Sequence, residues 1–187
     1  ALLRPYGIAC ISAGEMGLPE PEETETTFVG NARIKAHAAA KATGLPALAD
    51  DSGIEVDALG GAPGVYTANW AETPTGRDFV QAMTRTWEAL EKAGTPAPAR
   101  AHLRATMVMA WPDGHDEVFE GKVEGQVVWP MRGRQGHGYD PLFQIMHQVE
   151  QVLEVVDHEQ QRLVVVDLEV LVEDPLDLGG AALYRGR

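Results

Sequence analysis

Cysteine is nearly absent from this chain of 187 residues, and long apolar runs are missing altogether. The single cysteine, Cys10, has no internal partner for a disulfide, and its apolar neighbours are typical of a buried structural thiol. No stretch approaches the roughly 20 consecutive apolar residues of a membrane span, and no secretion signal opens the chain. We therefore expect a cytoplasmic protein without a membrane partner.

Basic residues are also scarce. The chain has 15 Lys and Arg against 28 Asp and Glu, which gives a formal net charge of −13. A surface this acidic repels phosphate backbones, and only four lysines are present to release counterions, so a nucleic-acid partner is not expected. A small anionic ligand remains compatible with this charge if a divalent cation accompanies it.

The hydrophobic pattern predicts a single α/β domain, residues 1–187, with a mixed sheet. One helix is expected over residues 28–43, capped by Thr26 or Thr27, and a second one is expected after Thr75. In the second helix an apolar stripe at helical spacing favours core packing over a cofactor site: Phe79, Met83, Trp87 and Leu90. Strands are expected at residues 6–12, 46–49, 54–57, 101–111, 117–123 and 125–129, and a weak one at 164–173.

Two adjacent carboxylates, Asp50 and Asp51, follow the predicted buried strand 46–49, and Ser52 and Gly53 come next. Like charges this close disfavour joint ionisation unless a cation or hydrogen bonds hold them. Magnesium binds carboxylate oxygens and leaves room for water and substrate phosphates. A turn in which these side chains only cap the backbone is the alternative for an isolated pair.

A second acidic pair, Glu22 and Glu23, precedes the first predicted helix, which carries Asn31 and Lys35 four residues apart and hence on one face. If this helix packs beside the strand that ends at Asp50, these groups meet at one edge of the sheet. Metal, lysine and carboxylate together suit phosphoryl transfer. Taken one by one, the same side chains also fit a solvated surface.

Four blocks, in order, closely resemble the inosine/xanthosine triphosphate pyrophosphatase family. They are the segment Pro21–Ala36, with its Glu-Glu pair, Asn31 and Lys35; the segment Leu45–Gly53, with Asp-Asp-Ser-Gly; the glycine-rich Leu59–Tyr66; and Gly136–Phe143, which matches a Gly-Phe-Gly-Tyr-Asp-Pro motif. The blocks span about three quarters of the chain, and their combination is highly specific.

The resemblance implies hydrolysis of non-standard purine nucleoside triphosphates, such as ITP, XTP and dITP, to monophosphate and pyrophosphate. It also implies Mg²⁺, an elongated α/β fold and a homodimer. By position it assigns proton acceptance to Asp51, phosphate contacts to Lys35 and Asn31, and nucleotide contacts to Ser52. The remaining implied sites are metal ligation by Asp51, Asp50, Glu22 and Glu23, and base binding by His137, Gly138, Tyr139 and Asp140.

Both ends of the chain depart from the family pattern. The N-terminal Ser/Thr-x-Asn-x-x-Lys phosphate loop and the C-terminal Ser-His-Arg motif are absent, and His137 replaces an aromatic residue of the family motif. Residues 1–143 carry the family pattern, whereas residues 144–187 lack lysine and serine and are rich in valine. Either a shifted reading frame or a diverged terminus would explain the composition of residues 144–187. An inactive remnant that only dimerises or binds is the alternative function.

Overall fold

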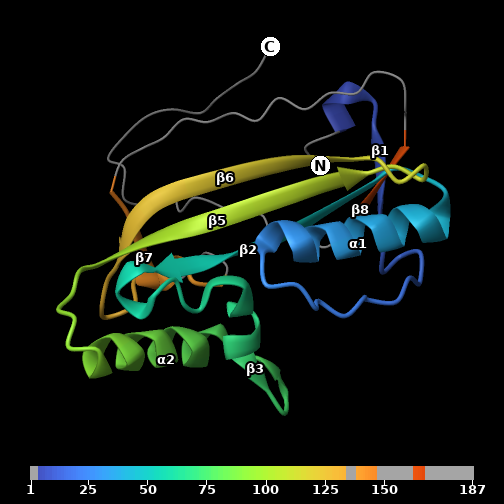
Figure 1. Cartoon of the computed structure of the whole chain (residues 1–187). Coiled ribbons are helices and arrows are strands. Elements are labelled where there is room, and N and C mark those ends of the chain that lie inside the picture. Colours follow the sequence, from blue (N-terminus) through green and yellow to red (C-terminus); the bar gives the residue numbers. More distant parts are fainter. Residues whose placement is uncertain (1–3, 134–137, 147–161, 167–187) are drawn as a thin grey trace.

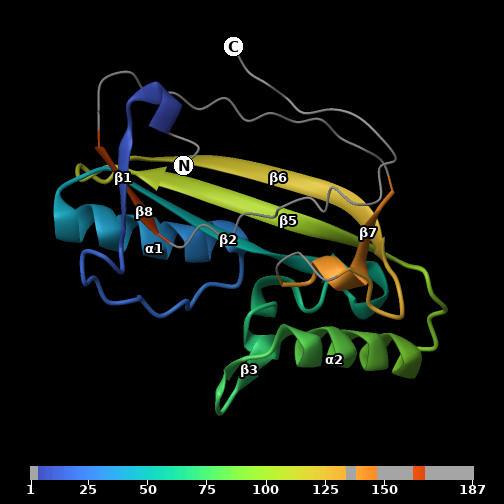
Figure 2. The ribbon, with the colours of Figure 1, turned by 180° about the vertical axis from the view of Figure 1, so that it is seen from behind.

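The computed structural model describes residues 4–133, 138–146 and 162–166, and it contains an elongated six-stranded mixed sheet flanked by helices (Figures 1 and 2). Two parallel pairings, β1 with β8 and β8 with β2, occupy one side of the sheet, and the remaining pairings are antiparallel. In spatial order the strands are β1 (Ala9–Ser12), β8 (Arg162–Val166), β2 (Ala47–Val56), β5 (Ala99–Ala110), β6 (Asp116–Val127) and β7 (Phe143–Ile145). The predicted fold class is confirmed.

Shorter elements connect these strands. A small ribbon of β3 (Glu72–Thr73) and β4 (Gly76–Arg77) forms a second sheet. Single 3₁₀ turns are η1 (Arg4–Tyr6), η2 (Asp57–Leu59), η3 (Gly64–Tyr66), η4 (Asn69–Ala71) and η5 (Asp140–Leu142). None of the helices among the described residues is both long and apolar enough to cross a membrane.

Helix α1 (Phe28–Thr43) has the bounds that its sequence predicts. The hydroxyl oxygen of Thr27 accepts a hydrogen bond from the Gly30 backbone N–H at 3.1 Å, so Thr27 rather than Thr26 is the cap. The helix ends at Gly44, whose φ of 70° lies in the left-handed region that glycine adopts at low cost.

Helix α2 (Phe79–Lys92) begins later than predicted. Asp78 is its cap, because its carboxylate accepts a hydrogen bond from the Gln81 N–H at 3.1 Å. Thr75 instead lies between β3 and β4, where its hydroxyl is 3.1 Å from that of Thr73. The predicted apolar stripe is confirmed: two of its members are fully buried and the other two pack against the same core.

Two breaks predicted from the sequence do not occur. Strand β2 continues without interruption through Asp50–Gly53, and β6 continues through residue 124, which separates the predicted strands 117–123 and 125–129. At Gly125 the glycine reflects packing rather than a turn, since the ring of Phe143 occupies the space that a Cβ would need.

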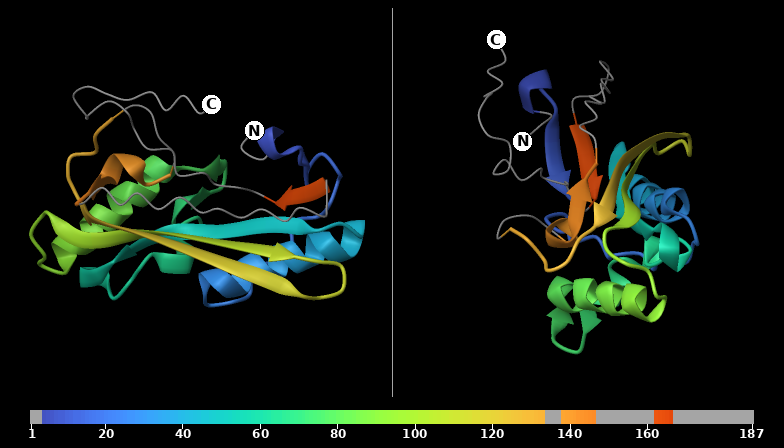
Figure 3. Two further views of the ribbon diagram at one scale, coloured as in Figure 1. Left: turned by 90° about the horizontal axis from the view of Figure 1, so that it is seen from above. Right: turned by 90° about the vertical axis from the view of Figure 1, so that its left-hand side faces the viewer.

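The two helices pack on opposite faces of the sheet and near its opposite ends (Figure 3). Ala47 and Ala49 of β2 belong to the α1 core, whereas Ile54 and Val56 belong to the α2 core. Consecutive residues of a strand point to opposite faces, so the change from odd to even positions means that β2 changes its covered face between these two pairs. This switch hides the periodicity of the strand in the sequence.

The outermost strand is more exposed than expected. Strand β1 begins at Ala9 rather than residue 6, and Cys10 is exposed, which corrects the prediction of a buried thiol. Among the described residues β1 pairs only with β8, and three of its four residues are exposed. Of the weak strand predicted at 164–173, residues 164–166 lie in β8 and the remainder lies outside the described residues.

Candidate active site

A buried lysine joins α1 to its surroundings at the centre of the candidate site. The Nζ of Lys35 lies 2.7 Å from Glu23 Oε1 and 3.7 Å from Asp51 Oδ1. Only 9% of the Lys35 side chain is exposed, against 34% for Glu23. A cation on a helix, a carboxylate from the preceding loop and a carboxylate from β2 therefore meet, as the sequence predicts for Lys35, Glu23 and Asp51.

Asn31 lies one turn before Lys35 on the same face of α1 and is buried. Its side-chain oxygen accepts a hydrogen bond from the Glu25 N–H at 3.0 Å, which fixes the loop that carries Glu23 to the start of the helix. The amide of Asn31 also acts on Asp51, whose pKa it lowers by hydrogen bonding to the charged form. Asn31 thus supports both carboxylates of the cluster.

Asp51 has the most perturbed carboxylate of this cluster. Burial raises its pKa to about 6, against an ordinary value of 3.8; the positive charge of Lys35 opposes this rise, and the negative charge of Glu23 adds to it. Its Oδ2 is buried and has no hydrogen-bond partner among the described residues. A carboxylate with a pKa near neutrality and one unused buried oxygen can accept a proton from water.

Lys35 remains charged in this setting. Burial alone would lower its pKa, but the hydrogen bond from Lys35 to Glu23 and the negative charges of Asp51, Glu23 and Asp50 outweigh it and raise the pKa above the ordinary value. An ammonium has three protons, of which Glu23 at 2.7 Å takes one, while Asp51 at 3.7 Å contributes its charge. A remaining proton can contact a phosphate oxygen.

The adjacent Asp50 adds its charge to this site but projects to the other face of the sheet. Consecutive residues of a strand project to opposite faces, so Asp50 lies on the face away from α1. There Ser52 Oγ donates a hydrogen bond to Asp50 Oδ2 at 3.0 Å. The structure therefore separates the two carboxylates that the sequence places together. It likewise puts Ser52 on the Asp50 side of the strand.

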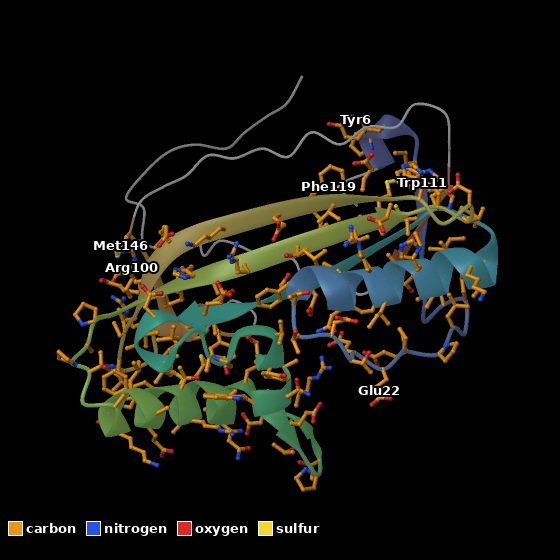
Figure 4. The ribbon with its side chains drawn as sticks, viewed as in Figure 1. Tyr6, Glu22, Arg100, Trp111, Phe119 and Met146 are labelled. Atoms are coloured by element: carbon orange, nitrogen blue, oxygen red, sulfur yellow. The ribbon has the colours of Figure 1, made fainter. Side chains whose placement is uncertain are left out.

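Of the two glutamates predicted before α1, only Glu23 reaches the cluster. Glu22 is exposed, and Figure 4 shows its side chain directed away from α1 and β2. Neighbouring residues of an extended loop point in different directions, so Glu23 contacts Lys35 while staying partly exposed, and Glu22 faces solvent.

The predicted base-binding segment belongs to the other half of the molecule. Tyr139 is only 3% exposed and packs in the α2 core, with its ring centroid 6.3 Å from that of Phe79 in an edge-on arrangement. It supports the segment from inside rather than offering a ring to a ligand. Gly138 precedes it with a φ of 58°, Asp140 begins η5, and His137 lies outside the described residues.

A cavity of about 390 Å³ lies between the segment that follows β1 and helix α1. Lys35 lines it together with Ser12, Leu18 and Ala39. The Lys35 side chain therefore borders this cavity as well as contacting the two carboxylates.

The carboxylates present fit only an incomplete metal site. Within the described ranges, no three His, Cys, Asp or Glu side chains converge so that they could hold a metal ion. Mg²⁺ commonly uses one or two protein carboxylates and takes its other ligands from water and substrate phosphates. The unused buried oxygen of Asp51, with the half-exposed carboxylate of Glu23 nearby, fits such a shared site.

Sequence reasoning missed a contact beside the cluster. Gly53, two residues after Asp51, lies under the side chains of Phe28 and Thr67. A glycine inside a strand pattern often marks the close approach of another segment, and this signal could have identified the contact.

Comparison with known proteins decides the family. The model of the Ham1 family matches residues 1–164. The chain belongs to the Ham1 family. The chain is 68% identical to a dITP/XTP pyrophosphatase of Ruegeria pomeroyi over 142 residues, and this alignment covers 76% of this chain and 70% of the relative. The dITP/XTP pyrophosphatase of Rhizobium meliloti is 58% identical over 146 residues, with coverage of 76% and 68%.

Solved structures of Ham1 proteins share the fold. A HAM1 protein from Coxiella burnetii superimposes with a TM-score of 0.71 at 38% identity, covering 77% of this chain and 73% of that one. A nucleoside-triphosphatase / dITP/XTP pyrophosphatase from Mycobacterium abscessus gives a TM-score of 0.64 at 32% identity, covering 79% and 77%. These likenesses agree with the resemblance that the four sequence blocks predict.

Proposed function

We propose that this chain hydrolyses non-standard purine nucleoside triphosphates, such as dITP, XTP and ITP, to the monophosphate and pyrophosphate. The observation that carries the proposal is the contact of the buried Lys35 with the buried Asp51 and with Glu23, in a member of the Ham1 family. The curated relatives named dITP/XTP pyrophosphatase support the substrate class.

In the proposed reaction, water attacks the α-phosphorus. Its oxygen forms the new bond to phosphorus, the bond to the bridging oxygen breaks, and pyrophosphate leaves with that oxygen. Asp51 accepts the proton of the attacking water, because its raised pKa makes it a stronger base than an exposed aspartate while leaving it mostly ionised at neutral pH. The ammonium of Lys35 stabilises the negative charge on the phosphate oxygens.

Asp51 and Glu23 are the residues that we propose as ligands of Mg²⁺. When bound, this ion neutralises phosphate charge and favours departure of pyrophosphate. Asn31 holds the loop of Glu23 in place through its bond to the Glu25 N–H. For the base we propose the segment that contains Gly138 and Asp140, and we expect the enzyme to act as a cytoplasmic homodimer.

The test is release of pyrophosphate in the presence of Mg²⁺ from four substrates: dITP, XTP, ATP and CTP. The proposal predicts rapid release from dITP and XTP and much slower release from ATP and CTP. Removal of the metal with a chelator should abolish release, and added Mg²⁺ should restore it. Absence of release from every substrate would refute the proposed function and favour the alternative, a family member that binds without turnover.

A further inference from the structure

Three segments of the chain meet directly beyond Asp51. They are the start of α1, the middle of β2 and the turn η3, and their meeting point is Gly53. A Cβ built on Gly53 would lie 2.5 Å from Thr67 Oγ1, 2.7 Å from the Gly64 carbonyl oxygen and 3.0 Å from Phe28 Cε1. Only glycine allows these segments to approach so closely.

Thr67 closes this junction with two hydrogen bonds. Its hydroxyl donates to the Gly64 carbonyl oxygen at 2.6 Å and accepts from the Ile54 backbone N–H at 3.1 Å. Strand β8 pairs with β2 only at Ala47–Ala49, so in the described structure no neighbouring strand serves the β8-side edge of β2 at Ile54. Thr67 provides the bond that a buried N–H requires there.

The junction is connected to the site through α1. Phe28, Asn31 and Lys35 lie on the same buried face of this helix, at spacings of three and four residues. Gly53 and Asp51 lie two apart on β2 and therefore share the face that α1 covers. Phe28 therefore contacts β2 two residues from Asp51, on the helix face that also carries Lys35.

The junction also lies where β2 changes partners. Just before it the strand packs against α1, and just after it Ile54 packs against the α2 core. The junction therefore lies where β2 passes from one core to the other, two residues after Asp51.

We propose that Thr67 is a positioning residue: by tying η3 to β2 against Gly53 and Phe28, it fixes the distance between Asp51 and Lys35. Thr67 touches no reacting atom. Its effect on turnover rests on the proposed function, whereas its effect on the placement of Lys35 does not. A hydroxyl that only stabilised the fold would leave both unchanged in the folded fraction.

The first test compares Thr67→Val, which removes the hydroxyl at nearly constant shape, with Thr67→Ser, which keeps it. Thr84→Val is the matched control, because the Thr84 hydroxyl donates to the Val80 carbonyl oxygen at 2.8 Å on α2, away from the junction. In folded protein we expect kcat for dITP to fall about tenfold or more in Thr67→Val with little change in KM, since small misplacements of reacting groups are costly. Thr67→Ser should recover most of the rate.

The second test does not need activity. An amine-reactive ester followed by mass spectrometry measures how fast Lys35 is modified relative to Lys41, an exposed lysine of the same helix. The ratio should rise severalfold in Thr67→Val and stay at the parental value in Thr67→Ser and Thr84→Val. Should Thr67→Val fail to fold, Phe28→Leu, which removes the ring from Gly53, is expected to raise the same ratio.

The two readouts separate the two proposals. A parent protein that releases no pyrophosphate, together with a labelling ratio that rises in Thr67→Val, would refute the proposed function and leave the positioning role intact. An unchanged ratio with unchanged kcat, or an equal loss in Thr67→Ser and Thr67→Val, would overturn the positioning role.

Discussion

The two halves of the molecule bury different kinds of side chain against the same sheet. On the α1 side the buried core consists of small residues: Ala32, Ala36, Ala39, Ala40, Ala47, Ala49, Val108 and Ala110. On the α2 side it contains larger ones, among them Ile54, Met83, Leu90, Val127 and Leu142. Figure 1 shows the two helices over separate parts of the sheet.

This difference separates stability from chemistry. Each buried methylene contributes about 0.8 kcal/mol, so the α2 half supplies most of the hydrophobic stabilisation. Alanines contribute less, but they let α1 approach β2 closely enough for Lys35 and Asp51 to meet out of water. The α1 half thus gives up apolar burial and gains a site in which charges are desolvated.

The largest expected effect on stability comes from the α2 half. Leu90 is completely buried there, and Leu90→Ala should lower the free energy of unfolding by about 2–5 kcal/mol, from lost burial and the cavity left behind. Urea unfolding followed by tryptophan fluorescence measures this. Val80→Ala, at a 59% exposed position of the same helix, is the control and should change little. A loss of kcat in folded Leu90→Ala would contradict the separation of the two halves, whereas a change in KM alone would not, because the proposed base-binding segment packs in the same core.

The α1 half should respond in the opposite way. Lys35→Met removes a charge-assisted contact of roughly 1.5–3 kcal/mol, so kcat/KM for dITP should fall about 10- to 100-fold while the protein stays folded. Lys41→Met, at an exposed position of α1, is the matched control and should keep parental activity. If Lys35→Met instead lowers Tm strongly and folded protein retains its rate, Lys35 is a structural lysine.

The sequence predicts some of this arrangement because local signals agree with the fold. Three features are visible in the local sequence of a single helix: the cap at Thr27, the stop at Gly44 and the stripe from Phe79 to Leu90. All three are confirmed. The meeting of Lys35 with Asp51 follows from placing that helix beside the strand, which the pattern also indicates.

Other features depend on contacts between distant segments and were not predicted. Asp50 and Asp51 look like a loop pair because β2 changes its covered face near Gly53, which breaks the alternation that identifies a strand. The same holds for Gly125, whose partner is the ring of Phe143. No pattern in the sequence shows which of Glu22 and Glu23 turns inward.

A smaller effect is expected from the burial of the Asp51 charge, and it can be measured without metal or substrate. The pKa of Asp51 is raised in the folded protein, so its protonated form favours folding, and this contribution is lost as the pH rises through about 6. Asp51→Asn removes the buried charge. The Tm of Asp51→Asn relative to the parent should therefore increase from about pH 5 to about pH 7. A difference in Tm that is constant or shrinks over this range would argue against a desolvated Asp51.

The most direct measurement of the central claim is the single-turnover rate of pyrophosphate release from dITP with Mg²⁺ in two matched variants, Asp51→Asn and Asp116→Asn. Asp116 binds Arg33 at 3.0 Å and His37 at 2.8 Å and pairs with Ala110, four residues along β5 from the partner of Asp51. The rate should fall at least about 100-fold in Asp51→Asn, as expected for loss of a general base, and stay near the parental value in Asp116→Asn. Equal rates in Asp51→Asn and the parent would show that the chemistry lies elsewhere.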